Sequence, residues 1–164
     1  MKIFYWSPFI SKVATVSSVI RSAESIIKYC DNNEKINVSI IDAIGEWNGY
    51  RNNINSKINI IKLNNKNYFN SLPRGGFLKS RFSYLFIFFI NFFKLKNILQ
   101  EKKPDFLIVH LITSLPIFLS LFLKKETKII LRLSGLPKLN VIRYLFWKLF
   151  SKKIHCITCP TIAT

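Results

Sequence analysis

Acidic residues are scarce in this chain. Its 164 residues include only 8 Asp and Glu against 25 Lys and Arg, which gives a formal net charge of +17. A coding bias toward Lys, Asn, Ile and Phe would not by itself deplete Glu, so the shortage of acid is informative. It predicts an anionic partner: a membrane surface, a nucleic acid or a phosphorylated substrate.

Cysteine is also rare, and this excludes several classes of protein. The three cysteines (Cys30, Cys156 and Cys159) do not suggest a disulfide framework. Cys156 and Cys159 have the spacing of a zinc or redox pair, but a zinc site needs about four ligands and only Cys30 and His155 are left to complete it. We therefore predict no metal site and no cofactor, and expect Cys156 and Cys159 to be small buried residues.

Several recognisable motifs are missing. The chain has no GxGxxG fingerprint, no zinc finger, no aromatic RNA-binding motif and no basic zipper, so a nucleic-acid partner is not expected. The start, "MKIFYWSPF", lacks the cleavage site of a secretory signal and is interrupted by Pro8. We predict that it forms a first strand and that the protein is cytoplasmic.

Two kinds of apolar segment alternate along the chain. Continuous runs such as "FLIVHLI" and "KIILRL" are typical of strands buried on both faces, whereas other segments have apolar residues on one helix face. This order predicts a single α/β domain over residues 1–164, a Rossmann-like, doubly wound, mainly parallel sheet with helices on both faces. We predict strands at 2–6, 36–41, 58–63, 105–112, 128–133 and 154–158, and helices at 13–29, 80–101, 114–124 and 139–150.

The segment from Phe106 to Leu123 allows a second interpretation. It has no charged residue and approaches the roughly 20 residues needed to cross a bilayer. Thr113 and Pro116 argue against a span, because a hydroxyl can cap a helix and proline fits a first helical turn. We therefore favour a strand, a turn and a helix, with a membrane span as the alternative.

Candidate functional residues follow the predicted strands, where open α/β sheets bind ligands. His110 could act as a base, donate a hydrogen bond or position a sugar hydroxyl, or it could be a hydrogen-bonded core histidine. Arg132, beside Ser134 and Gly135, could hold a phosphate or instead pair with a carboxylate such as Asp105. The start of the first helix offers free N–H groups near Thr15, and Lys12 would add charge there. The alternative is an ordinary helix start.

Two predicted helices suit a membrane surface. "KSRFSYLFIFFINFFKLK" is apolar on nearly all sides, and "KLNVIRYLFWKLFSKK" is amphipathic with a basic polar side. Basic helices with Phe and Trp lie well on anionic lipid, whereas core helices with a solvated basic rim are the alternative. The basic residues that we assign to the membrane surface are Lys79, Arg81, Lys94, Lys96 and Lys148.

Five stretches taken in order carry a resemblance to a known family. They are "YWSPFISKVATVSSVIRSAESI", "GFLKSRFSY", "KPDFLIVHLITSLP", "ILRLSGLPKLNVIRYLFWK" and "ITCPT". Together they resemble the N-terminal half of a bacterial family 4 glycosyltransferase of the GT-B fold. Such halves are Rossmann-like and hold the acceptor.

The resemblance implies roles for particular residues. His110 matches a strand-end histidine that faces the acceptor and the transferring sugar. Arg132, Ser134 and Gly135 match a loop that lines the same cleft. The first loop of the family approaches the donor phosphates with a Gly-Thr pair. Here Ala14 and Thr15 stand at that place, so this chain departs from the pattern.

The resemblance also implies partners and a location. These enzymes transfer a sugar from a nucleotide-sugar donor, and many act on lipid-linked or lipopolysaccharide acceptors at the cytoplasmic face of the inner membrane. The expected C-terminal domain, which binds the nucleotide sugar, is not in the 164 residues. We therefore expect an acceptor-binding half of a glycosyltransferase, peripheral on the membrane. The alternatives are a non-catalytic membrane-associated subunit that recruits a separate donor-binding chain, and a small integral membrane protein.

Overall fold

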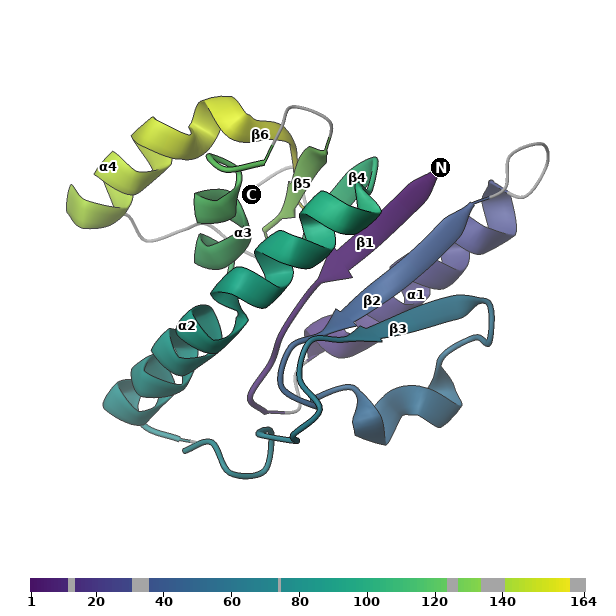
Figure 1. Cartoon of the computed structure of the whole chain (residues 1–164), viewed down its shortest axis with the longest axis horizontal. Coiled ribbons are helices and arrows are strands. Elements are labelled where there is room, and N and C mark those ends of the chain that lie inside the picture. Colours follow the sequence, from purple (N-terminus) through teal and green to yellow (C-terminus); the bar gives the residue numbers. More distant parts are fainter. Residues whose placement is uncertain (12–13, 31–35, 74, 124–126, 134–140, 160–164) are drawn as a thin grey trace.

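The computed structural model describes residues 1–11, 14–30, 36–73, 75–123, 127–133 and 141–159. Strands and helices alternate through these residues (Figure 1). The strands are β1 (Lys2–Trp6), β2 (Asn37–Asp42), β3 (Ile58–Lys62), β4 (Phe106–Val109), β5 (Lys128–Arg132) and β6 (Ile154–Thr158). The helices are α1 (Ala14–Tyr29), α2 (Phe77–Lys102), α3 (Ser114–Leu119) and α4 (Val141–Phe150), with short 3₁₀ turns η1 (Asn48–Asn53) and η2 (Ser151–Lys153).

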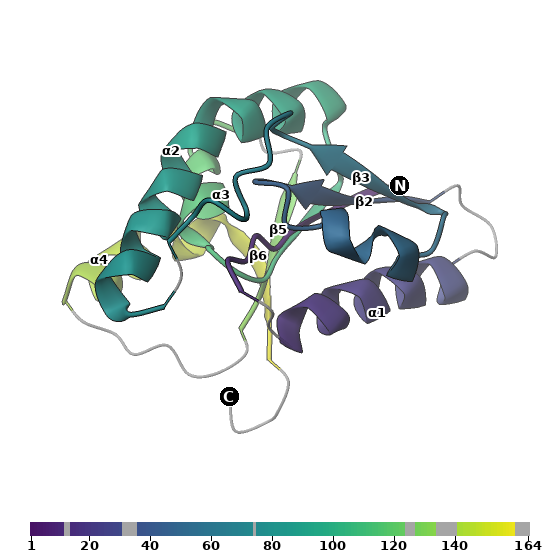
Figure 2. The ribbon, with the colours of Figure 1, turned by 90° about the horizontal axis from the view of Figure 1, so that it is seen from below.

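All six strands form one parallel sheet in the order β3-β2-β1-β4-β5-β6. The order reverses at β1, which pairs with β2 on one side and β4 on the other, as in doubly wound sheets. Helix α1 covers one face of the sheet, and α2, α3 and α4 cover the other (Figures 1 and 2). The predicted Rossmann-like fold is therefore confirmed.

Alternate residues of the central strand build two cores. Phe4 and Trp6 enter the core shared with α2, α3 and α4, whereas Ile3 and Tyr5 enter the core shared with α1. Successive side chains of a strand point to opposite faces, so a strand covered on both sides must be apolar throughout. This explains why the run from Ile3 to Trp6 has no polar position.

Helix α2 is much longer than the strands that it covers. Gly75 and Gly76 precede it with φ angles of 82° and 77°, a conformation that glycine adopts without strain. The helix ends at Lys103, which has a left-handed φ of 44° and donates its N–H to the carbonyl of Leu99 at 3.1 Å. Pro104 follows and cannot continue a helix.

The apolar segment Phe106–Leu123 is divided between two elements. It contains β4, a turn and the short helix α3, so the interpretation as a membrane span was wrong. Strand β4 stops at Val109, three residues earlier than predicted, because Ile112 turns the chain with a φ of 48°. Within the described residues, the helix that is long and apolar enough to cross a membrane is α2, and 28% of its most apolar window is buried inside the protein. A helix in the core of a soluble protein can be equally long and apolar.

Strand β6 forms an edge of the sheet with little cover. Among the described residues, its side chains from His155 to Thr158 are exposed. Cys156 and Cys159 are exposed free thiols, so the prediction that they are buried was wrong. An edge strand pairs with a neighbour on one side only. No group of three or more His, Cys, Asp or Glu side chains gathers in the described part of the chain.

Candidate functional site at the carboxyl edge of the sheet

Five polar side chains lie in one row where the strands end. The strand register aligns Trp6 with Ile41 and Val109, and Val109 with Leu131. These apolar residues belong to the core of α2, α3 and α4, so the next residue of each strand faces the α1 side. The row runs across β2, β1, β4, β5 and β6 as Asp42, Ser7, His110, Arg132 and Thr158. We call these residues the polar row.

His110 is held in the row by backbone and ring contacts. Its N–H donates to the carbonyl of Trp6 at 3.0 Å, and its ring centroid lies 6.0 Å from that of Tyr5. Its Nε2 is buried and has no hydrogen-bond partner among the described residues. Burial and, secondly, the positive charge of Arg132 lower its pKa to about 4. The imidazole is therefore neutral near pH 7 and can donate one hydrogen bond and accept another.

Tyr5 supports His110 from the same face of the sheet. Its hydroxyl shares a hydrogen bond of 2.9 Å with the hydroxyl of Ser22, which lies on α1. Burial raises the pKa of Tyr5, and the Ser22 hydrogen bond and the charge of Arg132 oppose that increase. Tyr5 therefore stays un-ionised and ties β1 to α1 below the polar row.

Arg132 is half-buried at the end of β5. Asp105, the carboxylate that could have paired with it, instead accepts the backbone N–H of Lys2 at 2.6 Å. Lys2 and Asp105 lie at the amino edge of the sheet, at the far end of the strands from Arg132. No hydrogen bond or ion pair joins Arg132 to another described residue, so its guanidinium group can meet an anion.

Two buried carboxyl groups shape the loop after β2. Both Glu46 oxygens accept backbone N–H groups, from Ala43 at 3.1 Å and from Ile44 at 2.7 Å. Asp42 Oδ1 accepts the N–H of Gly45 at 2.7 Å, and its Oδ2 is buried without a partner among the described residues. Burial and, next, the adjacent Asp42 raise the pKa of Glu46 well above its usual value. A raised pKa lets two acids lie together away from water.

The loop after His110 is strained. Ile112 has a φ of 48°, a value that β-branched residues rarely adopt, and its carbonyl accepts the indole N–H of Trp6 at 3.1 Å. Such strain costs about 1–3 kcal/mol and is often found beside ligand sites. The Trp6 hydrogen bond fixes the turn two residues beyond the imidazole.

The start of α1 lies at the same edge as the polar row, because the carboxyl end of β1 leads into it. Ala14 is exposed and Thr15 half-buried at this helix start. The first N–H groups of a helix have no partner within the helix and favour anions. The predicted residues Lys12, Ser134 and Gly135 lie outside the described part of the chain.

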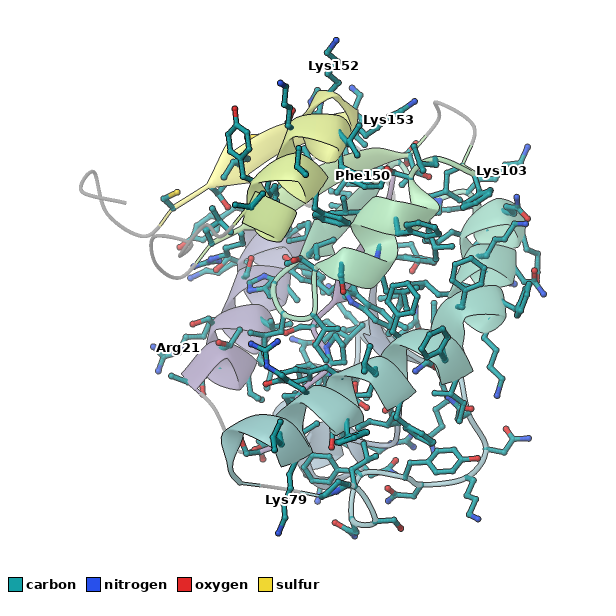
Figure 3. All side chains as sticks on the ribbon, turned by 90° about the vertical axis from the view of Figure 1, so that its left-hand side faces the viewer. Arg21, Lys79, Lys103, Phe150, Lys152 and Lys153 are labelled. Atoms are coloured by element: carbon teal, nitrogen blue, oxygen red, sulfur yellow. The ribbon has the colours of Figure 1, made fainter. Side chains whose placement is uncertain are left out.

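The basic residues assigned to a membrane do not all lie on one surface. Lys94 donates its ammonium group to Asn64, which also bonds the backbone of Ala43 after β2. Lys96 lies instead over the ring of Phe122, 5.4 Å from its centroid. Lys79 projects from the N-terminal end of α2 (Figure 3), Arg81 lies in the next turn, and Lys148 is exposed on α4.

Sequence reasoning missed part of the site. Ser7, Asp42 and Glu46 are all buried at the carboxyl edge, yet none was a candidate. The signal was present for Asp42, because "IDAIGEW" places a carboxylate directly after an apolar strand, as "IVH" places His110. Ser7 joins the row only through the strand register.

No protein-family model matches this chain, and no curated protein sequence matches it. Its fold does match a solved structure. UDP-GlcNAc 2-epimerase from Methanocaldococcus jannaschii superposes with a TM-score of 0.50 at 13% sequence identity, over 99% of this chain and 39% of that chain. This chain has a Rossmann-like fold like that of a GT-B-like enzyme. At this identity the likeness shows the fold alone, and membership of glycosyltransferase family 4 stays a prediction.

Proposed function

We propose that this chain is the acceptor-binding domain of a glycosyltransferase. It would work with a nucleotide-sugar donor and a lipid-linked or polysaccharide acceptor at the cytoplasmic face of the membrane. The polar row carries this proposal, because it sets a neutral buried imidazole beside an arginine at the ligand-binding edge of a Rossmann-like sheet. The epimerase that shares the fold is named for a nucleotide sugar, which agrees with the substrate class.

The electrostatics of the row suggest which step of such a transfer His110 and Arg132 would each assist. In glycosyl transfer the bond from the anomeric carbon to the donor phosphate breaks, and a bond to the acceptor oxygen forms. A histidine with a pKa of about 4 is a weak base at neutral pH, so His110 would orient the acceptor hydroxyl rather than keep its proton. The departing phosphate would take that proton, and Arg132 would stabilise the charge that the phosphate gains.

The test is sugar transfer in membranes from cells that express the native full-length protein. Labelled nucleotide sugars are supplied, and label is followed into the lipid and polysaccharide fractions. We expect His110→Ala to reduce transfer by about 10²-fold or more, the effect of removing one positioned hydrogen-bonding group. His155→Ala is the matched control, because His155 is the other histidine and is exposed on β6.

The same transfer assay also distinguishes the proposed function from its alternatives. Wild-type transfer by a folded His110→Ala protein would contradict the proposal. Label that appears only after a second chain is added would favour a non-catalytic subunit that recruits a donor-binding protein. Conversion of the labelled sugar without transfer would point to an epimerase.

A further inference from the structure

The outer side of α2 carries a stripe of exposed apolar side chains. Its members recur every three or four residues, as on one face of a helix, and are between 37% and 70% exposed. They are Leu78, Phe82, Leu85, Phe86, Phe89 and Phe93. The opposite side of α2, with Ile87, Leu95 and Leu99, packs on the sheet. The stripe therefore remains exposed after the core is complete.

Helix α4 repeats this arrangement in the same layer. Val141, Tyr144, Leu145 and Leu149 are between 51% and 75% exposed, whereas Phe150 on the inner side is buried. The end of α3 lies between the two helices, and Phe118 contacts both Phe92 of α2 and Phe150 of α4. Leu121 and Phe122, just beyond α3, are also exposed. The exposed apolar residues of α2 and α4, with these two, form what we call the outer face.

Basic residues accompany the outer face and acids are nearly absent from it. Helix α4 has no acidic residue, and the acid of α2 is Glu101 in its last turn. Lys96 lies against Phe122, and Lys148 lies among the exposed residues of α4. Lys79 projects at one end of the layer and Lys152 and Lys153 at the other (Figure 3). Long basic side chains can lay their stems on apolar surface and hold their charge at an anionic boundary.

The outer face also extends toward the polar row. Helix α2 has 26 residues and is about 39 Å long, whereas the five residues of β1 span about 16 Å. The loop from β3 brings the chain to the carboxyl edge, so α2 starts there, and its N-terminal part extends beyond the strand ends (Figure 1). Phe82, Leu85 and Phe86 belong to the N-terminal half of α2. A bilayer on the outer face would therefore lie beside the edge that holds His110.

We infer that the outer face is a docking surface for an anionic lipid bilayer, on which α2 and α4 lie parallel to the membrane. The apolar stripes enter the boundary between headgroups and acyl chains, and the flanking lysines meet anionic headgroups. This inference deepens the proposed function, because a lipid-linked acceptor is met at a membrane. Its test measures binding alone and requires no sugar transfer.

The first experiment is co-sedimentation of the full chain with phosphatidylcholine vesicles, with and without phosphatidylglycerol. We expect binding to the anionic vesicles and an affinity at least about tenfold lower for the double variant Phe82→Ser/Phe89→Ser. The control is Tyr29→Ser on α1, because Tyr29 is 71% exposed and Phe89 is 70% exposed. An equal loss in the control, or no loss in the double variant, would overturn the inference.

A second pair of variants distinguishes binding through the outer face from binding through the net charge of the protein. Lys79→Gln/Lys148→Gln removes two charges from the outer face, and Arg21→Gln/Lys28→Gln removes two from α1 on the opposite layer. We expect the first pair to weaken vesicle binding severalfold more than the second. Equal effects would mean that non-specific charge holds the protein to the vesicle, and would overturn the assignment of the face.

Two further outcomes would replace the bilayer with another arrangement. A dimer in solution that the Phe82→Ser/Phe89→Ser variant dissociates, without vesicle binding by the wild type, would make the outer face an interface between copies. Wild-type protein that resists alkaline carbonate extraction from its own membranes would indicate that α2 crosses the bilayer. Vesicle binding by a wild-type protein that shows no sugar transfer would refute only the proposed function.

Discussion

Ser7, Asp42 and His110 each keep a buried polar atom without a hydrogen-bond partner in the described part of the chain. A buried group left in this state costs about 1–3 kcal/mol, so three at one edge are a considerable cost to the fold. The strained turn at Ile112 adds to it. The hydroxyl groups of a bound ligand would donate to Asp42 and exchange hydrogen bonds with Ser7 and His110, so ligand binding in the row should stabilise the protein.

At the residue scale, His110 should make stability depend on pH. Its folded-state pKa of about 4 lies below the 6.5 of free histidine, so the unfolded chain binds this proton more readily. The free energy of unfolding should therefore fall as pH decreases from about 6.5 toward 4, by up to about 3 kcal/mol. Urea unfolding at about pH 7 and about pH 5 should show a smaller decrease for His110→Gln than for wild type. His155→Gln should behave as wild type, and equal decreases in all three proteins would show that another group titrates.

At the element scale, the fold and the site could be predicted from the sequence only where the ends of the strands could be predicted. Strands β1 and β6 begin and end as predicted, because a proline follows the first and lysines precede the second. Strand β4 is shorter than predicted, because Ile112 takes a left-handed conformation. Such a turn is usually predicted from a glycine, and this position has none. His110 and Arg132 could be found as polar residues that end apolar runs. Ser7 could not, because it enters the row through pairing between strands distant in sequence.

The two sides of α2 should respond differently to truncation. Ile87 is fully buried, so Ile87→Ala should lower the free energy of unfolding by about 2–4 kcal/mol through the cavity that it leaves. Phe89 is largely exposed, so Phe89→Ala should change it by less than about 0.5 kcal/mol. Denaturant titration measures both. A destabilisation by Phe89→Ala as large as that of Ile87→Ala would mean that another part of the chain covers the outer side of the helix.

At the scale of the whole molecule, charge works against the compact state. A net charge of +17 on 164 residues implies self-repulsion that salt can screen, since the Debye length falls from about 14 Å at 50 mM to about 4 Å at 500 mM. Scanning calorimetry should therefore show a Tm that rises by roughly a few degrees over this range of sodium chloride. The Tm of the Lys152→Gln/Lys153→Gln variant should rise less with salt than the Tm of the wild type, because the variant has less charge repulsion to screen. A Tm that is constant or lower in salt would contradict this account.

The polar row has two chemically different ends. Asp42 lies at one end and Arg132 toward the other, with the uncharged Ser7 and His110 between them. A long ligand with a phosphate at one end and free hydroxyls at the other would therefore have a preferred direction along the strand ends. Its phosphate would be drawn to β5 and its hydroxyls toward β2. The reversed orientation would bring the phosphate close to the Asp42 carboxylate. The row would therefore select one orientation of such a ligand before any reaction takes place.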